Sequence, residues 1–465
     1  MKDFVKYTLA TLCGLFLAGI ALFILGILSI AGMMTMESAA PSIKPQSVLR
    51  LTLNGELQED APNDPLGDLF GSTYPTLSLR EIQTAIQGAK ENPNIDGIYI
   101  EAQTLLGATP AMIRDIRESL ADFKKSGKYI IAYGDNYTQG AYYICSIADS
   151  IILNPQGQVN WCGMASQPIF YKDLLEKIGI KMQVFKVGSY KSAVEPFTAT
   201  QMSDANREQV TSYLNDIWQT MLTDVSRSRS IKKDLLNEYA DSMLTFRPAE
   251  ELVRNGMIDS LCYIDGISRM LRAKTGKDKG ALPLVSVKEL AAATEATPKK
   301  GDKIAVYYAY GDIVDRKTEW SENVIDAETV CRDLRTLRED ESVKAVVLRV
   351  NSGGGSAYAS EQIWHEVKLL REAKPVVVSM GGMAASGGYY ISCAANYIVA
   401  ELTTLTGSIG IFGLIPDASQ LLSDKLGLHF DVVKTNAHAD FGTLARPFNP
   451  SEAQMMQGYI PVSYT

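Results

Sequence analysis

The sequence predicts an α/β protein with two tandem copies of one folding unit behind an apolar N-terminal segment. Three observations lead to this prediction. Short β-rich runs such as GIYIEA and AVVLRV alternate with stretches of helical length, which is typical of largely parallel sheets flanked by helices. The runs of the first half recur in order in the second half of the 465-residue chain. The N-terminus carries an uncharged stretch longer than the roughly 20 residues of a membrane span.

The N-terminal stretch, residues 7–36, is expected to be an uncleaved transmembrane anchor. It also exceeds the roughly 7–15 apolar residues of a cleavable signal peptide. A buried core helix is disfavoured, because this helix would be apolar on every face. Lys2 and Lys6 precede the span and Glu37 is the first charge after it. The positive-inside rule therefore puts the N-terminus in the cytoplasm. In a bacterium the span would cross the inner (plasma) membrane, with the remaining residues in the periplasm.

The composition disfavours several other classes of protein. A formal net charge of −8 argues against a nucleic-acid partner, because such proteins usually carry a basic surface. The 6 cysteines form no CxxC pair and are too few for a disulfide framework in so long a chain. The 3 histidines are few for a metal enzyme. We therefore expect neither nucleic acid nor a bound metal.

The prediction of a duplication rests on three pairs of matching segments. They follow one another at offsets of about 250 residues, which is the pattern of a repeated unit. The pairs are 48–58 with 304–314, 91–103 with 339–351, and 127–154 with 373–400. We expect a first domain at 46–287 and a second at 303–465. The polar run 288–302 contains a proline and ends in a Lys/Gly cluster, so it is expected to be the linker.

Helices are expected between the strands, at Ala111–Lys125 in the first copy and at Ser360–Glu372 in the second. After Pro196–Phe197 the first copy continues with a long helical stretch, roughly Asp204–Arg272. The matching Pro447–Phe448 is followed only by residues 449–465. The second copy is therefore expected to be truncated by some tens of residues.

The segment GGMAASGGYYIS suggests a nucleophile. It places Ser386 between the apolar run Val376–Met380 and a segment that can be helical, Tyr389–Ala395. A helix N-terminus favours negative charge, which suits an alkoxide, and the glycines that follow leave the backbone open to a substrate. The first copy has Gln139 at this position. On the local sequence alone, a simple helix cap is the commoner role for such a serine.

The loop NSGGGS, Asn351–Ser356, directly follows the run AVVLRV. Its three consecutive glycines expose backbone N–H groups, as an oxyanion hole requires. It is no Walker loop, because no Gly-Lys-Ser/Thr follows at the right spacing. A phosphate-cradling loop of another kind or a plain turn stays open. The first copy has QTLLGAT here, without the glycine run.

The candidate base is a lysine. None of the three histidines, His365, His429 and His438, has a place that suggests a Ser–His–Asp arrangement. A desolvated lysine can replace histidine, because burial lowers its pKa and leaves a neutral amine. Lys191 lies in the mostly uncharged stretch VFKVGSYKSAVEPF, and the second copy has no lysine at the matching place. A solvated surface charge is still the commoner role of a lysine, and the spacing alone does not overturn it.

Four motifs in order, GSYKSAVEPF, RVNSGGGS, MAASGGYYIS and LTGSIGIFG, closely resemble the long form of bacterial signal peptide peptidase A. This is a family of membrane-anchored serine peptidases with a Ser–Lys dyad. The resemblance implies two tandem spiral β/α domains of the caseinolytic-protease and crotonase type, and a homotetramer over the membrane. It implies Ser386 as the nucleophile and Lys191 as the general base, with no metal or other cofactor.

The resemblance also implies supporting residues. Ser408 of TGSIG matches the serine that hydrogen-bonds and orients the lysine amine. The glycines after Asn-Ser match the oxyanion loop, which implies the Gly354 amide as first donor and the Gly387 amide as its partner. The family usually has Asn-Ser-Pro-Gly-Gly-Ser, whereas Gly353 stands here in place of the proline. We therefore expect a less preorganised loop.

The implied function is an endopeptidase that degrades residual signal peptides and other apolar peptides after secretion. Three alternatives remain. One is a crotonase-type acyl-CoA enzyme on the same fold, and another is an inactive truncated paralogue that acts as a membrane scaffold. The third is a penicillin-binding enzyme, for which Ser230–Lys233 fits SxxK and Lys274–Gly276 fits KTG. We interpret those last two motifs as solvated surface charges.

Overall fold

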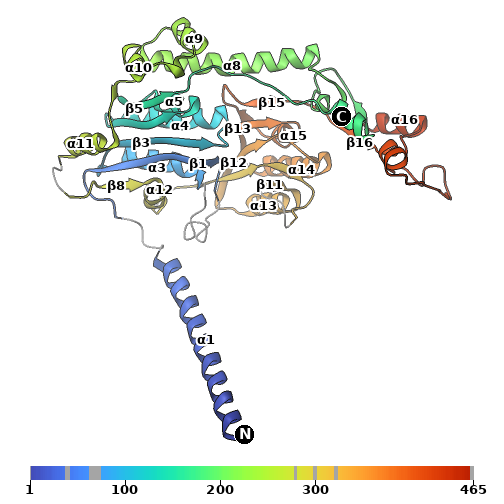
Figure 1. Ribbon diagram of the computed structural model, residues 1–465, viewed down its shortest axis with the longest axis horizontal. Helices are drawn as coiled ribbons and strands as arrows, with labels where there is room; N and C mark the ends of the chain where they lie inside the picture. The colour runs from blue at the N-terminus through green and yellow to red at the C-terminus, as the bar shows by residue number, and fades with distance from the viewer. Residues whose placement is uncertain are drawn as a thin grey trace.

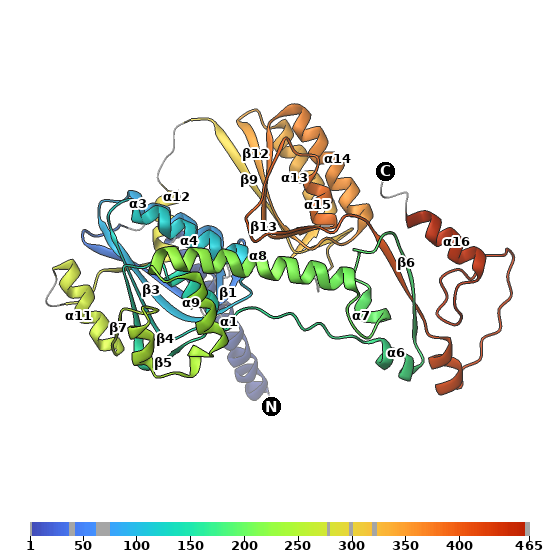
Figure 2. The same cartoon turned by 90° about the horizontal axis from the view of Figure 1, so that it is seen from above.

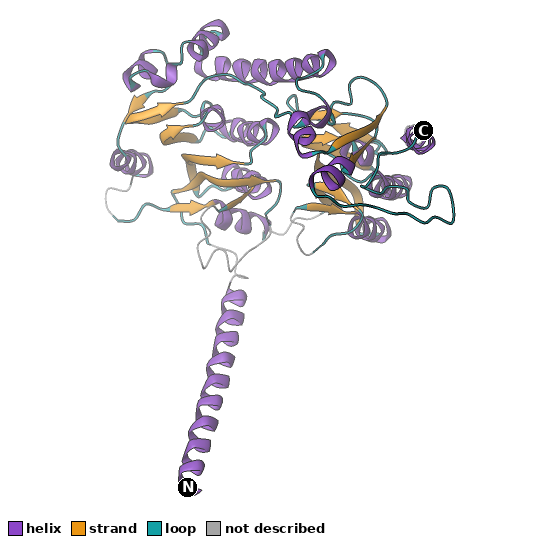
Figure 3. Ribbon diagram, turned by 45° about the vertical axis from the view of Figure 1, so that its right-hand side comes forward, coloured by secondary structure: helices purple, strands orange, loops and turns teal. Residues whose placement is uncertain are grey.

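The computed structural model describes residues 2–36, 42–61, 75–276, 280–296, 301–318 and 323–460. A single long helix, α1 (Lys2–Met36), projects away from the body of the protein (Figures 1 and 3). Within the described residues, its stretch Lys6–Gly26 is long and apolar enough to cross a membrane, and none of it is buried in the protein. The helix therefore fits a single-pass membrane anchor, as the sequence predicts.

The first unit is built on a seven-stranded sheet of order β2-β1-β3-β4-β5-β7, with β8 also pairing with β1. Every pairing is parallel. The strands are β1 (Ser47–Gln58), β2 (Thr76–Ser78), β3 (Ile95–Leu106), β4 (Tyr129–Tyr137), β5 (Ser150–Val159), β7 (Ser260–Leu261) and β8 (Leu284–Ser286). Their continuous apolar runs are buried, as parallel strands covered on both faces require.

Helices cover both faces of this sheet. The main core lies under α3 (Leu79–Glu91), α4 (Pro110–Lys124) and α5 (Gln139–Cys145). A smaller cluster on the other face packs Val48 and Tyr99 against Ile267 and Leu271 of α11 (Ile264–Thr275). The expected long helical stretch after residue 204 is interrupted. It forms α8 (Asp204–Arg229), α9 (Lys233–Asp241), the 3₁₀ turn η1 (Leu244–Phe246), α10 (Ala249–Arg254) and α11.

The prediction of a linker at 288–302 is wrong for the first part of that range. Val287–Glu295 forms helix α12, which opens with a capping box between Ser286 and Glu289. Leu290 and Ala291 are buried in the core of the first unit. The sequence did not predict this helix, because only one side of it packs on the core and polar residues surround that short apolar face. The first unit therefore extends to α12.

The second unit repeats the architecture with a five-stranded parallel sheet of order β14-β13-β12-β9, in which β15 also pairs with β13. Its strands are β9 (Lys303–Tyr310), β12 (Val343–Ser352), β13 (Val376–Ala385), β14 (Tyr397–Val399) and β15 (Leu405–Gly407). Helices α13 (Ala327–Glu339), α14 (Ala357–Ala373) and α15 (Gly387–Ser392) pack on a separate core. The short strands β10 (Asp312–Val314) and β11 (Val324–Asp326) pair beside it. The predicted α/β class with parallel sheets is confirmed.

One segment of the first copy lies with the second unit. It contains α6 (Lys172–Ile178), β6 (Lys181–Lys186) and α7 (Glu195–Thr198). Strand β6 pairs antiparallel with β16 (Phe412–Asp417). In Figure 2 this segment runs away from the first sheet to β16 and α16 (Pro450–Tyr459). The chain therefore delivers residues 181–198 to the far side of the second unit.

Candidate active site

Ser386 occupies a sharp turn between β13 and α15. Its backbone has φ +53° and ψ −117°, a conformation that costs energy in any residue with a side chain. The turn is held because the Ser386 N–H donates to the Gly407 carbonyl at 2.9 Å, and the Ser386 carbonyl accepts from the Tyr390 N–H at 2.9 Å. The serine side chain does not cap the helix. Its Oγ is therefore directed to another partner.

That partner is Lys191, which the loop after β6 carries into the second unit. Lys191 Nζ lies 3.2 Å from Ser386 Oγ, 3.1 Å from Ser408 Oγ and 2.6 Å from the Ser408 carbonyl oxygen. A neutral amine has two N–H donors and one lone pair. It can donate both protons to Ser408 and accept the proton of Ser386. The structure thus brings together three residues that the sequence singles out.

The lysine is well shielded from water. Lys191 is only 5% exposed, and burial lowers the pKa of its amine, because desolvation penalises the ammonium form. The ring of Phe412, the first residue of β16, lies 6.0 Å from Nζ. Phe412 pairs with Lys186 at the end of β6, and the Lys186 amine donates to the Lys191 carbonyl at 3.2 Å. The β6–β16 pairing therefore holds the lysine loop against the second unit.

The glycine loop lies directly against Ser386. Gly354 has φ +100°, and a Cβ added to it would lie 2.6 Å from the Gly387 nitrogen and 2.9 Å from the Ser386 Cβ. Only glycine fits there. The Gly354 N–H, however, donates to Ser352 Oγ at 3.1 Å. In this conformation the Gly354 amide is engaged within its own loop, whereas Gly387, the first residue of α15, lines the pocket in front of Ser386.

A pocket of about 380 Å³ opens beside Ser386 and Gly387. Its lining is largely apolar and includes Trp364, Tyr389, Ile409 and Ile411, with Cys393 and Glu361 among its other members. The Tyr390 hydroxyl donates to Glu361. The sequence did not indicate this pocket, although Glu361 and Trp364 stand three residues apart on α14 and so share one face of that helix.

At the matching turn of the first unit, a glutamine stands in place of Ser386. Gln139 opens α5 there, and its Oε1 accepts from the Cys162 and Gly163 N–H groups, each at 3.0 Å. Its Nε2 donates to the Gly163 carbonyl at 3.0 Å. These three bonds tie the side chain to the neighbouring loop. The turn between strand and helix is kept, and the position that matches Ser386 is occupied by a structural amide.

The motifs of the penicillin-binding alternative lie elsewhere. Ser230 follows the last residue of α8 in a left-handed conformation. Lys274 is in the last turn of α11, where its amine lies 5.5 Å from the centre of the Tyr129 ring. Neither residue lines the pocket beside Ser386.

The chain is similar to several known peptidases. The model of peptidase family S49 matches residues 122–277 and 368–465, and the Clp protease model matches 312–400. Protease 4 of Salmonella typhi is 39% identical over 434 residues, covering 90% of this chain and 70% of that protein. Protease 4 of Haemophilus influenzae is 35% identical over 447 residues, covering 91% and 72%. A chloroplastic serine protease of Arabidopsis thaliana is 32% identical over 422 residues, covering 89% and 61%. With both copies of the repeat matched in this way, the chain belongs to peptidase family S49 and is a serine-type peptidase.

Proposed function

We propose that the chain is a membrane-anchored endopeptidase that degrades residual signal peptides and other apolar peptides after secretion, with Ser386 and Lys191 as its catalytic dyad. One observation carries the proposal. A buried lysine amine lies 3.2 Å from the hydroxyl of a serine held in a strained turn. A nucleophile within hydrogen-bond reach of a base that is itself oriented by a third group is the arrangement required for acyl transfer.

The mechanism follows from the positions of these atoms. Neutral Lys191 takes the Ser386 proton as Oγ forms a bond to the peptide carbonyl carbon. The Gly387 N–H stabilises the oxyanion, joined by the Gly354 N–H once it leaves Ser352 Oγ. The Lys191 ammonium then protonates the leaving amine as the C–N bond breaks. Water, deprotonated by the same amine, hydrolyses the acyl-enzyme.

Ser408 acts on the base and not on the substrate. Its carbonyl and hydroxyl oxygens accept from Lys191 Nζ at 2.6 and 3.1 Å. These bonds fix two of the amine's three directions, which leaves the third for Ser386. The pocket beside Ser386 supports an apolar side chain at the residue whose carbonyl is attacked, since its walls include Trp364 and two isoleucines.

We also propose that α1 keeps the two units on the periplasmic side of a bacterial inner membrane, and that four copies of the chain assemble there. Lys2 and Lys6 before the span support this orientation. An anchor at the membrane surface would hold the active site where apolar peptides leave the bilayer. Native mass spectrometry in detergent would measure the number of copies.

The test is a peptidase assay in detergent on an apolar signal-sequence peptide. Cleavage by the wild-type chain should be lost in Ser386→Ala and in Lys191→Ala, by at least about 10³-fold. Lys177→Ala is the matched control, because this exposed lysine lies in the same segment on α6, and it should cleave like wild type. Activity that survives both dyad substitutions would refute the assigned site. A folded wild-type chain that cleaves nothing would favour the membrane scaffold.

A further inference from the structure

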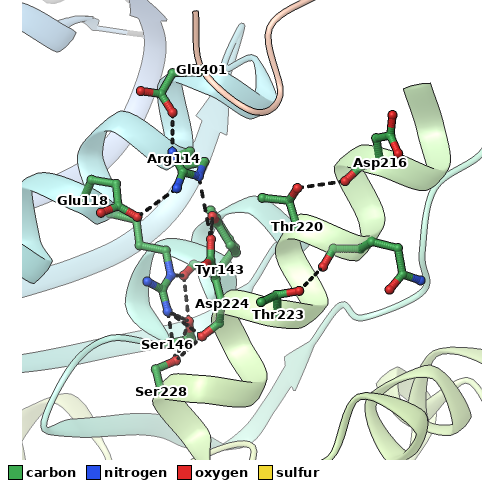
Figure 4. A network of polar contacts seen from close by, with 12 residues as sticks. Arg114, Glu118, Tyr143, Ser146, Asp216, Thr220, Thr223, Asp224, Ser228 and Glu401 are labelled. Carbon is green, nitrogen blue, oxygen red and sulfur yellow. Dashed lines mark hydrogen bonds and ion pairs between the residues drawn. The ribbon is translucent and has the colours of Figure 1, made fainter. Parts of the chain in front are cut away.

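Two arginines, one from each unit, form ion pairs with carboxylates of the other unit. Arg114 of α4, in the first unit, pairs with Glu401 of the second (Figure 4). Arg349 of β12, in the second unit, pairs with two carboxylates of the first, Glu59 (Nε–Oε2 3.0 Å) and Asp115 (Nη2–Oδ2 2.7 Å). The side chains of Arg349, Glu59 and Asp115 are 13%, 2% and 12% exposed. The cluster is therefore buried where the units meet.

Arg349 also connects the two strands that lead into the active site. Its Nη1 donates to Ser379 Oγ at 3.1 Å and to the Met380 carbonyl at 3.3 Å, both on β13. Strand β12 continues into the glycine loop with Gly354, and β13 ends next to Ser386. A guanidinium presents five N–H donors in a rigid planar fork. It can therefore fix the spacing of the two strands together with the position of the carboxylates.

The first unit makes close contact with β13 just before Ser386. A Cβ added to Gly381 would lie 2.4 Å from Glu59 Oε1, and one added to Gly382 would lie 2.3 Å from Thr109 Oγ1. Thr109 is the N-cap of α4, the helix that carries Asp115. Strand β13 thus has no space to move toward the first unit. Its path depends on both the packing and the ion pairs.

The internal repeat shows that the strand itself does not require an arginine. The matching position of the first copy is Glu101 of β3. Glu101 accepts from Arg50 within the first unit at 2.7 Å, and the Arg50 side chain is 47% exposed. The two copies share the strand and differ in this side chain. The arginine occurs in the copy whose strands reach both the other unit and the nucleophile.

We propose that Arg349, held by Glu59 and Asp115, is a positioning residue that sets the spacing of β12 and β13 and so aligns Ser386 with Lys191 and the glycine loop. This inference rests on the proposed function of the dyad. A purely structural role predicts only a less stable protein, because breaking a buried ion pair leaves an uncompensated charge. A positioning role predicts a slower chemical step in protein that is still folded.

The experiment compares Arg349→Gln, Arg349→Lys and the matched control Arg50→Gln in the full chain in detergent. For an apolar signal-sequence peptide, Arg349→Gln should lower kcat by about 10–100-fold, since small misplacements of reacting groups have effects of this size. KM should change by less than about threefold, because the pocket beside Ser386 is retained. Arg349→Lys should recover part of kcat, and Arg50→Gln should match wild type. If Arg349→Gln lowers only the melting temperature, with kcat per folded molecule unchanged, the proposal is wrong.

A second readout does not depend on turnover. The rate at which an amine-reactive reagent modifies Lys191, followed by mass spectrometry across pH, reports the titration of that amine. Arg349→Gln should move this titration toward that of an ordinary lysine, because a loosened dyad admits water, and Arg50→Gln should not.

If wild type cleaves nothing while this shift is seen, the proposed function fails and the positioning role stands. An unchanged titration in folded Arg349→Gln overturns the positioning role. Glu59→Gln, which keeps the shape of the side chain, replaces Arg349→Gln if that variant does not fold.

Discussion

Lys191 is a buried lysine whose amine contacts two serines and an aromatic ring. It is enclosed by the serine turn, the Ser408 loop and the ring of Phe412. Burial lowers the pKa of its amine below the ordinary lysine value. A lysine that only stabilised the fold would gain from a carboxylate partner, as Lys90 does from Asp122 at 2.5 Å. The environment of Lys191 instead favours a base.

This environment predicts a pH dependence for activity. In the proposed mechanism the deprotonated amine is the base, so kcat/KM should fall as the pH drops through the lowered pKa of Lys191. The midpoint should lie below the roughly 10.4 of a free lysine. A pH–rate profile on the signal-sequence peptide measures it. A midpoint at the ordinary lysine value would contradict a desolvated base.

The lowered pKa of Lys191 also makes the free energy of unfolding depend on pH. Between the lowered folded pKa and the unfolded value, the unfolded chain binds more protons, so the free energy of unfolding rises with pH across that window. Below it, the buried ammonium lowers stability by a constant amount. Lys191→Met should therefore lose activity yet melt at the same or a higher temperature at neutral pH. Lys177→Met is the control, because that lysine is exposed on α6.

Among the elements, the loop between β12 and α14 imposes a tight steric limit on the site. Gly354→Ala would put a methyl group 2.6 Å from the Gly387 nitrogen at a φ of +100°. Strain of this kind costs on the order of 1–3 kcal/mol, and relief requires the loop to move away from Ser386. We expect kcat/KM to fall by about 100-fold or more, as measured with the same peptide.

Gly353→Ala provides the comparison for this prediction. A Cβ at Gly353 would meet only the flexible Met383 side chain, with Sδ at 3.2 Å. This variant should keep most of the activity and nearly the same melting temperature. Equal losses in both variants would mean that the loop as a whole, and not the contact of Gly354 with Gly387, limits the reaction.

The sequence predicted those elements whose pattern is local. Helices α4 and α14 lie within a few residues of their predicted bounds, because each carries a regular apolar stripe after an N-cap residue, Thr109 or Ser356. Ser386 and Lys191 stood out because the two copies differ there. The β6–β16 pairing was not predictable, since a short strand of mixed polarity has its partner more than two hundred residues away. The bond from the Gly354 amide to Ser352 Oγ was equally hidden, because a loop's hydrogen bonds depend on its folded conformation.

At the scale of the whole molecule, the two units of the repeat contribute different residues to one proposed site. The first copy has Gln139 at the position that matches Ser386, and the loop after β6 carries its Lys191 to the second unit. Figure 2 shows β6 lying away from the first sheet. The second copy keeps the serine and the glycine loop. Lys191 comes from the first copy and Ser386 from the second, so neither unit supplies both residues of the proposed dyad. The geometry of the proposed active site therefore depends on how the units are joined, and the Arg349 cluster lies where they meet.

The repeat also bears on the proposed assembly of four copies. The segment Gly427–Lys434 (GLHFDVVK) matches Gly179–Lys186 (GIKMQVFK), which contains β6. In the first copy that strand pairs with β16. In the second copy the matching segment lies outside any strand, and Val433 is 99% exposed. An exposed apolar segment with a strand-forming counterpart is suited to pairing with another chain.

We therefore expect Val433→Asp to shift the detergent-solubilised protein toward smaller assemblies, because it places a charge in the strand that would meet the neighbouring copy. Light scattering coupled to size-exclusion chromatography measures the mass. Leu402→Asp is the control, since Leu402 is an exposed apolar residue outside this segment. If Val433→Asp and Leu402→Asp both keep the wild-type mass, the copies meet through another surface. If Val433→Asp dissociates the assembly while peptide cleavage persists, each chain completes its own site, as the Lys191–Ser386 contact within one copy implies.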